Sequence, residues 1–247
     1  MSQAGLVDID VHWEENPEMT MKHFDSTVFD VRQSVLIMAG HAQNALCSAM
    51  RSFRERDDNK ANIVIDNDSL LDQLHRQVDT TAFNHLALRH PFAGNLRFVA
   101  MAMRVACNLE RVGDQSVSIA RNTLALNRLP PLDFTPRIDE LASLAGAMLH
   151  KSLNAYVAEN TLQAQEVIDA DEEMDCLNRQ KYYSIVDRMI NDSKIITRCI
   201  HLININKCLE RIADHATNIA ECTLFLHTGK YVRRGDRTLE DAMKHNR

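Results

Sequence analysis

The 247-residue sequence is poor in the residues on which β-sheet proteins depend. Aromatic residues make up 5% of the chain, with a single Trp, and there are only 7 Gly and 5 Pro. Strands favour aromatic and β-branched side chains, and the turns between them need glycine. These shortages argue against a sheet protein. The hydrophobic share of 45% is nevertheless ordinary for a globular chain, so we expect an all-α protein with a substantial core.

The sequence also lacks excess positive charge and long apolar runs. The formal net charge is −6, so no general attraction to nucleic acid or to anionic membranes is expected. No apolar run approaches the roughly 18 residues that a membrane-spanning helix needs. The start of the chain lacks the basic and apolar regions of a signal peptide. We therefore expect a cytoplasmic protein with no nucleic-acid partner and no direct membrane insertion.

A disulfide framework is not expected either. The chain has six cysteines and no C-x-x-C pair, which argues against both a disulfide-stabilised fold and a zinc knuckle. Most of them fall within helical patterns, so we predict reduced thiols that pack in the core of a cytosolic protein. They are Cys47, Cys107, Cys176, Cys199, Cys208 and Cys222.

The five prolines fall at predicted element boundaries, and three of them lie in the segment "RLPPLDFTP", the best candidate for a linker. The segments without proline have apolar residues at helical spacing. They predict six long antiparallel helices at 23–57, 60–89, 93–128, 137–159, 162–190 and 194–228. Gly229 is placed to end the last helix. The predicted divisions are a loose leader (1–21), a first bundle (22–129), a linker (130–136), a second bundle (137–229) and a charged tail (230–247).

An internal repeat relates the two predicted bundles. The segment "NLERVGDQSVSIARNT" is matched 100 residues later by "CLERIADHATNIAEC", and "IDNDSLLDQLHRQ" is matched 103 residues later by "IDADEEMDCLNRQ". Each half therefore has a helix with D-x-D-x-x-x-D followed by a helix with E-x-x-x-D. The change of offset fits a change of length in a turn. We infer two tandem homologous three-helix bundles.

Both repeated motifs place acids four residues apart, on one face of a helix, where like charges are unfavourable. Crowded carboxylates must take up protons or a cation, and oxygen ligands suit Mg²⁺, Mn²⁺, Ca²⁺ or iron. If the second and third helices of each half pack with these faces adjacent, four carboxylates gather per half. The candidate metal ligands are Asp68, Asp72, Glu110 and Asp114 in the first half, and Asp171, Asp175, Glu210 and Asp214 in the second half.

Further residues bear on this prediction. Asp66 and Asp169 are additional candidate ligands, and His215 offers a softer ligand in the second half. Gly113 lies between two acids inside a helix, where glycine costs about 1 kcal/mol relative to alanine, so a neighbour is expected to approach closely there. The alternative is that each acid is solvated, or is paired on the surface with an arginine: Arg76, Arg111, Arg179 or Arg211.

The motifs "LERVGD" and "LERIADHATNIAE", with "LALRHPFAGNLR" before the first, resemble the PhoU family of phosphate-uptake regulators from about residue 21 to residue 229. The resemblance implies a pair of three-helix bundles in a cytoplasmic, non-enzymatic protein that forms homodimers. It implies an adaptor between the ATPase subunit of the phosphate ABC transporter and a sensor histidine kinase, which keeps starvation genes off when phosphate is plentiful. It also implies iron or zinc ions on the eight acids named above, in addition to the Mg²⁺ or Mn²⁺ that their oxygen ligands suit.

Two other functions stay open at the level of sequence. One is a di-metal carboxylate enzyme of the ferritin-like type, although the Glu-x-x-His spacing of such bundles is not found. The other is an accessory protein of a different phosphate carrier. The phosphate-binding pattern G-x-x-x-x-G-K-[ST] is also not found in the sequence, so tight binding of free phosphate is not expected.

Overall fold

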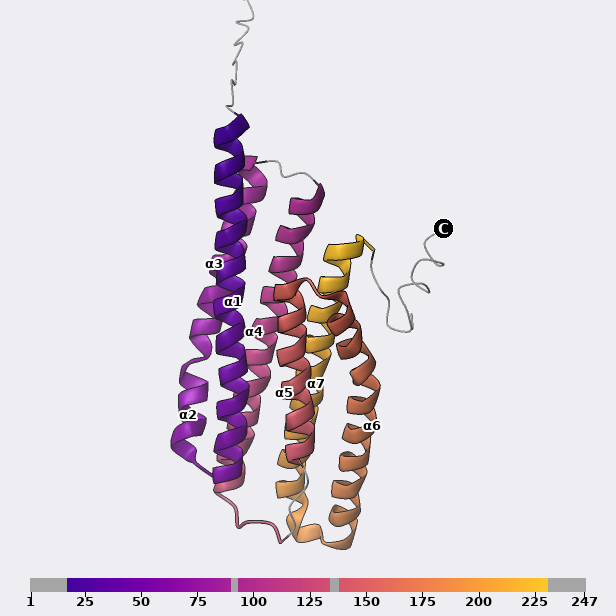
Figure 1. The fold of residues 1–247 in the computed structure, drawn as a ribbon. Coiled ribbons are helices and arrows are strands. Elements are labelled where there is room, and N and C mark those ends of the chain that lie inside the picture. Colours follow the sequence, from indigo (N-terminus) through magenta and orange to yellow (C-terminus); the bar gives the residue numbers. More distant parts are fainter. Residues whose placement is uncertain (1–16, 90–92, 134–137, 231–247) are drawn as a thin grey trace, which may run out of the picture.

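The computed structural model describes residues 17–89, 93–133 and 138–230, and within these ranges all regular structure is helical (Figure 1). The all-α prediction is therefore confirmed. The first half contains α1 (Pro17–Glu55), α2 (Asp58–Asp66), α3 (Asp68–Arg89) and α4 (Ala93–Asn127). The second contains α5 (Ile138–Ala158), α6 (Thr161–Asn191), the short 3₁₀ helix η1 (Ser193–Ile195) and α7 (Ile196–Thr228).

The helix boundaries differ from the predicted ones at two places. α1 begins at Pro17, inside the predicted leader 1–21, and residues 1–16 and 231–247 of the predicted leader and tail lie outside the described residues. The predicted helix 60–89 is interrupted at Asn67, whose N–H still bonds to the carbonyl of Ile63 at 3.2 Å. Asp57 begins α2 by accepting hydrogen bonds from two backbone N–H groups of its first turn, as an N-cap aspartate does.

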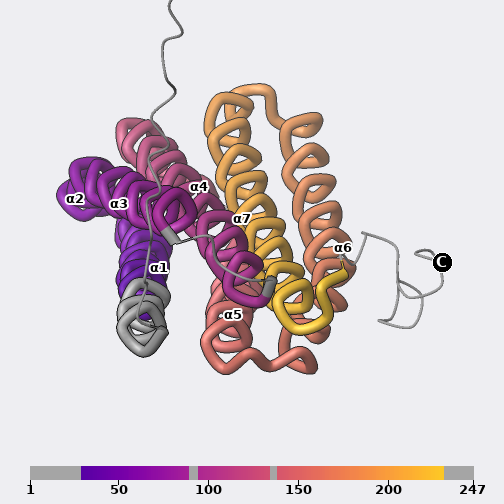
Figure 2. Tube along the Cα trace, turned by 90° about the horizontal axis from the view of Figure 1, so that it is seen from above, coloured from indigo at the N-terminus to yellow at the C-terminus, as the bar shows by residue number. Residues whose placement is uncertain are grey.

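Consecutive long helices run antiparallel, and the two halves stand side by side (Figure 1). Seen from above, α4 and α7 occupy the centre of the molecule, while α3 and α6 lie at opposite outer edges (Figure 2). Among the described elements, α3 contacts only α1, α2 and α4, and α6 contacts only α5, α7 and η1. The contact between the halves is therefore made by α1 with α5 and by α4 with α7.

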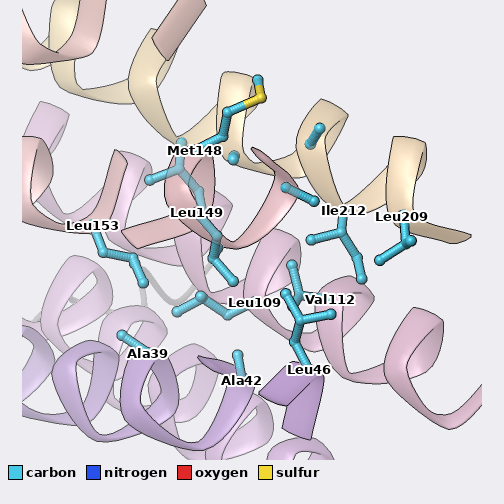
Figure 3. Packing of buried hydrophobic residues seen from close by; sticks show 14 of the residues in the cluster. Ala39, Ala42, Leu46, Leu109, Val112, Met148, Leu149, Leu153, Leu209 and Ile212 are labelled. Carbon is cyan, nitrogen blue, oxygen red and sulfur yellow. The ribbon is translucent and has the colours of Figure 1, made fainter. Parts of the chain in front are cut away.

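This contact pairs equivalent helices of the two halves, α1 with α5 and α4 with α7. Along α1 and α5, the ion pair Arg54–Asp139 (2.5 Å) lies near one end and the ion pair Arg32–Glu159 (2.7 Å) near the other. Leu46 of α1, Leu109 of α4, and residues of α5 and α7 meet in one hydrophobic core (Figure 3). The two homologous bundles therefore form one body with approximate two-fold symmetry.

The repeat is visible in the pattern of burial as well as in the sequence. Residues 105–120 and 205–220 have the same burial class at every one of the equivalent positions. The predicted close approach at Gly113 is confirmed, because a Cβ atom built there would lie 2.5 Å from Cδ1 of Leu71 on α3. The side of α7 that faces the core is buried at Leu209, Ile212, Ala216, Ile219 and Thr223.

Arginine side chains hold the described part of the predicted linker against the bundle. Nη2 of Arg56 donates to the carbonyl oxygens of Leu126 and Leu129, each at 2.9 Å. Nη1 of Arg198 donates to the carbonyl oxygens of Pro130 and Pro131, each at 3.1 Å. Arg56 itself has a positive φ of 51° at the turn between α1 and α2. The remaining linker residues, 134–136, lie outside the described residues.

The prediction of core thiols is correct for half of the cysteines. Cys199, Cys208 and Cys222 are buried, and burial raises the pKa of Cys222 to about 12, so this thiol stays protonated. The prediction is wrong for the other three, which are exposed because they fall on the outward faces of α1, α4 and α6: Cys47, Cys107 and Cys176. The predicted end of the last helix is confirmed, since Gly229 caps α7 with φ 69°.

Candidate functional site

In the first half, the packing of α3 against α4 brings the predicted carboxylates close enough to interact. Asp68 lies in the first turn of α3, and burial followed by the charges of Asp114 and Asp72 raises its pKa. Burial followed by the charge of Asp114 likewise raises the pKa of Glu110, with Asp72 adding to the effect. Mutual repulsion of this kind shows that α3 and α4 contribute to a single acidic surface.

Arginine contacts this acidic surface, as the alternative interpretation of the sequence supposed. Nε of Arg111 lies 3.4 Å from Oε2 of Glu110, and its Nη1 lies 3.4 Å from Oδ2 of Asp114. Oε2 of Glu110 is nevertheless buried without a hydrogen-bond partner. The arginine is more than half exposed, so solvent screens both ion pairs.

The donor set fits a hard cation only in part. Four carboxylates offer the oxygen ligands that Mg²⁺, Mn²⁺ or iron accept, and one of their oxygens is buried without a hydrogen bond. In the residues that the structure describes, however, no three side chains of His, Cys, Asp or Glu are grouped so that they could hold a metal ion. Binding there would require the carboxylates to change rotamer and Arg111 to move away.

In the second half, the equivalent carboxylates are distributed differently. Asp171 accepts a hydrogen bond from Oγ1 of Thr217 at 3.4 Å. Asp175 and Glu210 line one cavity between α6 and α7, whereas Asp214 lines another cavity, between α4 and α7. The second set is therefore divided between two cavities. The further candidates Asp66 and Asp169 are both exposed, and Asp169 accepts from the Gln165 side chain at 3.0 Å.

The cavity between α4 and α7, of about 460 Å³, contains His215 together with Arg111, Arg211 and Asp214. Burial and then the charges of the two arginines lower the pKa of His215 to about 4. Its Nδ1 lies 3.0 Å from Oδ1 of Asn108 on α4. The predicted softer ligand is therefore a neutral imidazole at neutral pH, and one of its nitrogens is already engaged across the contact between the halves.

The sequence analysis did not identify the asparagines at the contact between α4 and α7, nor the buried asparagine of α7. Asn108 and Asn122 of α4 bond to His215 and His201 of α7 at 3.0 and 2.9 Å. Asn206 on α7 is buried, although the first half has Ala106 at the equivalent position (206 − 100 = 106). Asn206 could have been identified from the sequence, because one repeat has an amide at a core-facing position where the other has an apolar residue.

The fold and this surface define a class: an all-helical protein made of two homologous three-helix bundles, each with an acid-rich motif on its second and third helices. The PhoU domain family matches the chain at residues 35–123 and again at 138–223, once in each half.

Curated relatives and solved structures agree with this class. The chain is 33% identical to a "Phosphate-specific transport system accessory protein PhoU homolog" of Xylella fastidiosa, over 85% of this chain and 89% of the relative. It is 33% identical to the protein of the same description from Zymomonas mobilis, over 85% and 89%. The crystal structure of PhoU from Pseudomonas aeruginosa superposes with a TM-score of 0.82 at 28% identity, over 83% of this chain and 99% of that one.

A second solved structure, the phosphate transport system regulatory protein PhoU from Streptococcus pneumoniae, gives a TM-score of 0.79 at 26% identity, over 85% of this chain and 99% of that one. The chain belongs to the PhoU family. Within the described residues, no helix is both long and apolar enough to span a bilayer.

Proposed function

We propose that this chain is a cytoplasmic accessory protein of the phosphate-specific transport system. In this proposal it is a non-enzymatic adaptor between the ATPase subunit of the phosphate ABC transporter and a sensor histidine kinase, and it represses starvation genes when phosphate is plentiful. The observation that supports it is the pair of PhoU-domain matches, one in each bundle. The names of the curated relatives, which are accessory proteins of phosphate-specific transport, agree with it.

The arrangement of the outer helices suits a protein that meets two partners. The halves share a central scaffold, but α3 and α6 lie at opposite edges (Figure 2). The two helices also carry different side chains. α3 exposes Phe83 and Leu88, at 59% and 75%, and α6 exposes Leu162 and Ile190, at 76% and 78%. Burial of such side chains against a partner is favourable. In this proposal each edge meets a different partner.

A cellular assay tests the repressing role. A strain that lacks its own family member carries a reporter under a phosphate-starvation promoter, and the full chain is expressed in it at high phosphate. We expect the reporter to fall to the level of the unmodified strain. A reporter that stays on, in cells that contain the folded chain at normal abundance, contradicts the proposal.

The rival functions differ in what they require. A ferritin-like enzyme would consume oxygen when loaded with iron, and the family match favours a regulator over it. An accessory protein of another phosphate carrier would co-purify with that carrier in place of the ABC transporter.

Light scattering of the purified chain tests the proposed homodimer, which predicts twice the 28.1 kDa mass of one chain.

We also propose that the first-half carboxylates hold a cation, with Asp68, Asp72, Glu110 and Asp114 as oxygen ligands and Fe, Zn, Mg or Mn as the metal. Burial, and then the charges of neighbouring carboxylates, raise the pKa values of Asp68 and Glu110. This supports the proposal, because a bound cation stabilises the ionised form of both groups. For the second half, a metal site stays a prediction of the sequence.

Metal analysis of purified chains tests this second proposal. The variant Glu110→Ala/Asp114→Ala is compared with its counterpart Glu210→Ala/Asp214→Ala, which changes the equivalent motif of the other repeat. The proposal expects the first variant to lose metal relative to the unmodified chain. Equal metal content in the first variant and the unmodified chain counts against the site.

A further inference from the structure

A cavity of about 370 Å³ lies between α6 and α7 in the second half. Its lining includes Asn206 and Lys207 of α7, with Arg179, Tyr182 and Tyr183 of α6. Both charged and aromatic groups therefore surround one buried amide. The acidic residues that line it with them are Asp175 and Glu210.

Asn206 is the unusual member of this lining. It is 1% exposed, and neither its amide nitrogen nor its amide oxygen has a hydrogen-bond partner. Burying an amide without a partner destabilises a fold. The fold does not require an amide here, because the first half has Ala106 at the equivalent position, also fully buried. The unsatisfied donor and acceptor of Asn206 are therefore available to a ligand.

The halves also differ at other residues that line the same cavity. With the offset of 103, Tyr182 and Tyr183 replace Asp79 and Thr80 of the first half, and with the offset of 100, Lys207 replaces Cys107. The chain has only 4 tyrosines, and two of them lie here, exposed by 40% and 64%. The second half thus has aromatic rings and an ammonium group where the first half has neither.

Each of these groups matches one part of a nucleotide. The amide of asparagine can pair with the N6 and N7 edge of adenine in a bidentate manner. An exposed tyrosine ring stacks on a base. Lysine and arginine bind phosphate oxygens, and carboxylates accept hydrogen bonds from ribose hydroxyls. We propose that this cavity binds an adenine mononucleotide, with Asn206 recognising the base, Tyr182 stacking on it, and Lys207 with Arg179 facing the phosphates.

Several side chains that line the cavity are exposed, among them Lys207, Arg179 and Tyr182. In this proposal they move aside as the nucleotide enters, and the Asn206 amide keeps its place on α7. The base is then held by a group that does not need to be ordered on binding, which favours affinity.

Titration calorimetry of the full chain with ATP, ADP, AMP, adenosine and GTP tests the proposal. We expect the adenine nucleotides to bind, with GTP at least tenfold weaker. Asn206→Ala should weaken ATP binding at least tenfold, which is the loss of about one bidentate base contact. Lys207→Ala should weaken ATP and leave adenosine unchanged.

A second measurement, on the chain without nucleotide, does not depend on binding. Removing an unsatisfied buried amide should raise Tm, by about 2 to 4 °C for each kcal/mol recovered in a chain of this size. The matched control is Ala106→Asn, which buries an amide in the first half and should lower Tm without creating a nucleotide site. Both variants use the residue already present in the other repeat.

Three results would overturn the proposal. The first is the absence of binding by any adenine nucleotide at millimolar concentration. The second is undiminished ATP binding by Asn206→Ala, or equal binding of GTP. The third is a fall in the Tm of Asn206→Ala without nucleotide, which would mean that the amide stabilises the fold. None of these results bears on the adaptor role, because the cavity was identified without reference to the transporter.

Discussion

His215 of α7 donates its Nδ1–H to Oδ1 of Asn108 of α4 at a distance of 3.0 Å, and this hydrogen bond crosses the contact between the two halves. The direction follows from the neighbours of Asn108. Its Nδ2 donates to the Arg104 carbonyl at 2.8 Å, and its Oδ1 also accepts from Nδ2 of Asn218 at 3.3 Å. Oδ1 is therefore an acceptor on both sides, so the proton of the neutral imidazole must lie on Nδ1.

This arrangement predicts a loss of stability in mild acid. The folded-state pKa of His215 is about 4, below the ordinary value of 6.5. The unfolded chain therefore binds the proton more readily, and stability falls as the pH falls from 6.5 towards 4. We expect the free energy of unfolding, measured in urea, to decrease more steeply over this range in the unmodified chain than in His215→Gln.

The comparison isolates one histidine among many titrating groups. Asp68 and Glu110 have raised pKa values, so they contribute with the opposite sign, but they are present in both proteins and cancel in the difference. Parallel curves for the unmodified chain and His215→Gln would show that the imidazole is not held neutral at this contact.

Gly113→Ala should destabilise the protein. The new Cβ would lie 2.5 Å from Cδ1 of Leu71, a buried side chain that must shift towards the neighbouring cavity to make room. Overpacking of this kind costs about 1–3 kcal/mol, and alanine recovers about 1 kcal/mol of helix propensity. We expect a net loss of about 1 kcal/mol in the free energy of unfolding.

Gly146 of α5 is the matched control for this substitution. It also lies inside a helix, but a Cβ atom there would meet nothing within 4 Å. Gly146→Ala should therefore stabilise the protein by about 1 kcal/mol. If the two substitutions shift the urea midpoint in the same direction by the same amount, then α3 does not approach α4 as described.

Asp68→Asn should stabilise the chain in the absence of added metal. Burial and the charges of Asp114 and Asp72 disfavour its ionised form. Solvent screens much of this repulsion because the group is partly exposed, so removing the charge should raise the stability at pH 7 by only about 0.5 kcal/mol. Urea unfolding in the presence of a chelator measures this. Asp66→Asn, at an exposed position on the preceding helix, is the control and should leave stability unchanged. A loss of stability in Asp68→Asn would contradict the repulsion.

Arg198→Ala should loosen the connection between the halves. Its guanidinium donates to the carbonyl oxygens of both Pro130 and Pro131, and each such hydrogen bond contributes about 1 kcal/mol. We expect faster limited proteolysis within 127–133, measured by mass spectrometry of the fragments. The control is Arg128→Ala, an exposed arginine near the same segment. Equal cleavage rates in the two variants would show that Arg198 does not restrain the linker.

The sequence predicted those features of the fold that depend on local patterns repeated along the chain. The duplicated motifs around Glu110 and Glu210 indicated equivalent helices, and the burial of 105–120 and 205–220 agrees at every position. The helical glycine between two acids indicated the close approach at Gly113, because glycine is otherwise unfavourable there. Helix periodicity was enough for these features.

Features that depend on which helices meet were not predictable. The helix is interrupted at Asn67, but no proline or glycine in the sequence marks this position. The division of Asp175 and Asp214 between two cavities depends on α4 packing against α7, and no motif in either half specifies that contact. The pairing of Asn108 with His215 joins residues 107 positions apart, beyond the reach of any helical period.

We propose that this chain connects the phosphate transporter to a kinase through its two outer edges. The most direct measurement is co-purification of the full chain with the transporter ATPase subunit and with the sensor kinase, each alone. The edge variants are Phe83→Glu/Leu88→Glu on α3 and Leu162→Glu/Ile190→Glu on α6, with Asn84→Glu and Ser184→Glu as exposed controls on the same helices. We predict that the unmodified chain and both controls retain both partners, and that each edge variant loses one. The adaptor role is contradicted if the unmodified chain retains neither partner. It is also contradicted if each edge variant still retains the ATPase subunit and the kinase as the unmodified chain does.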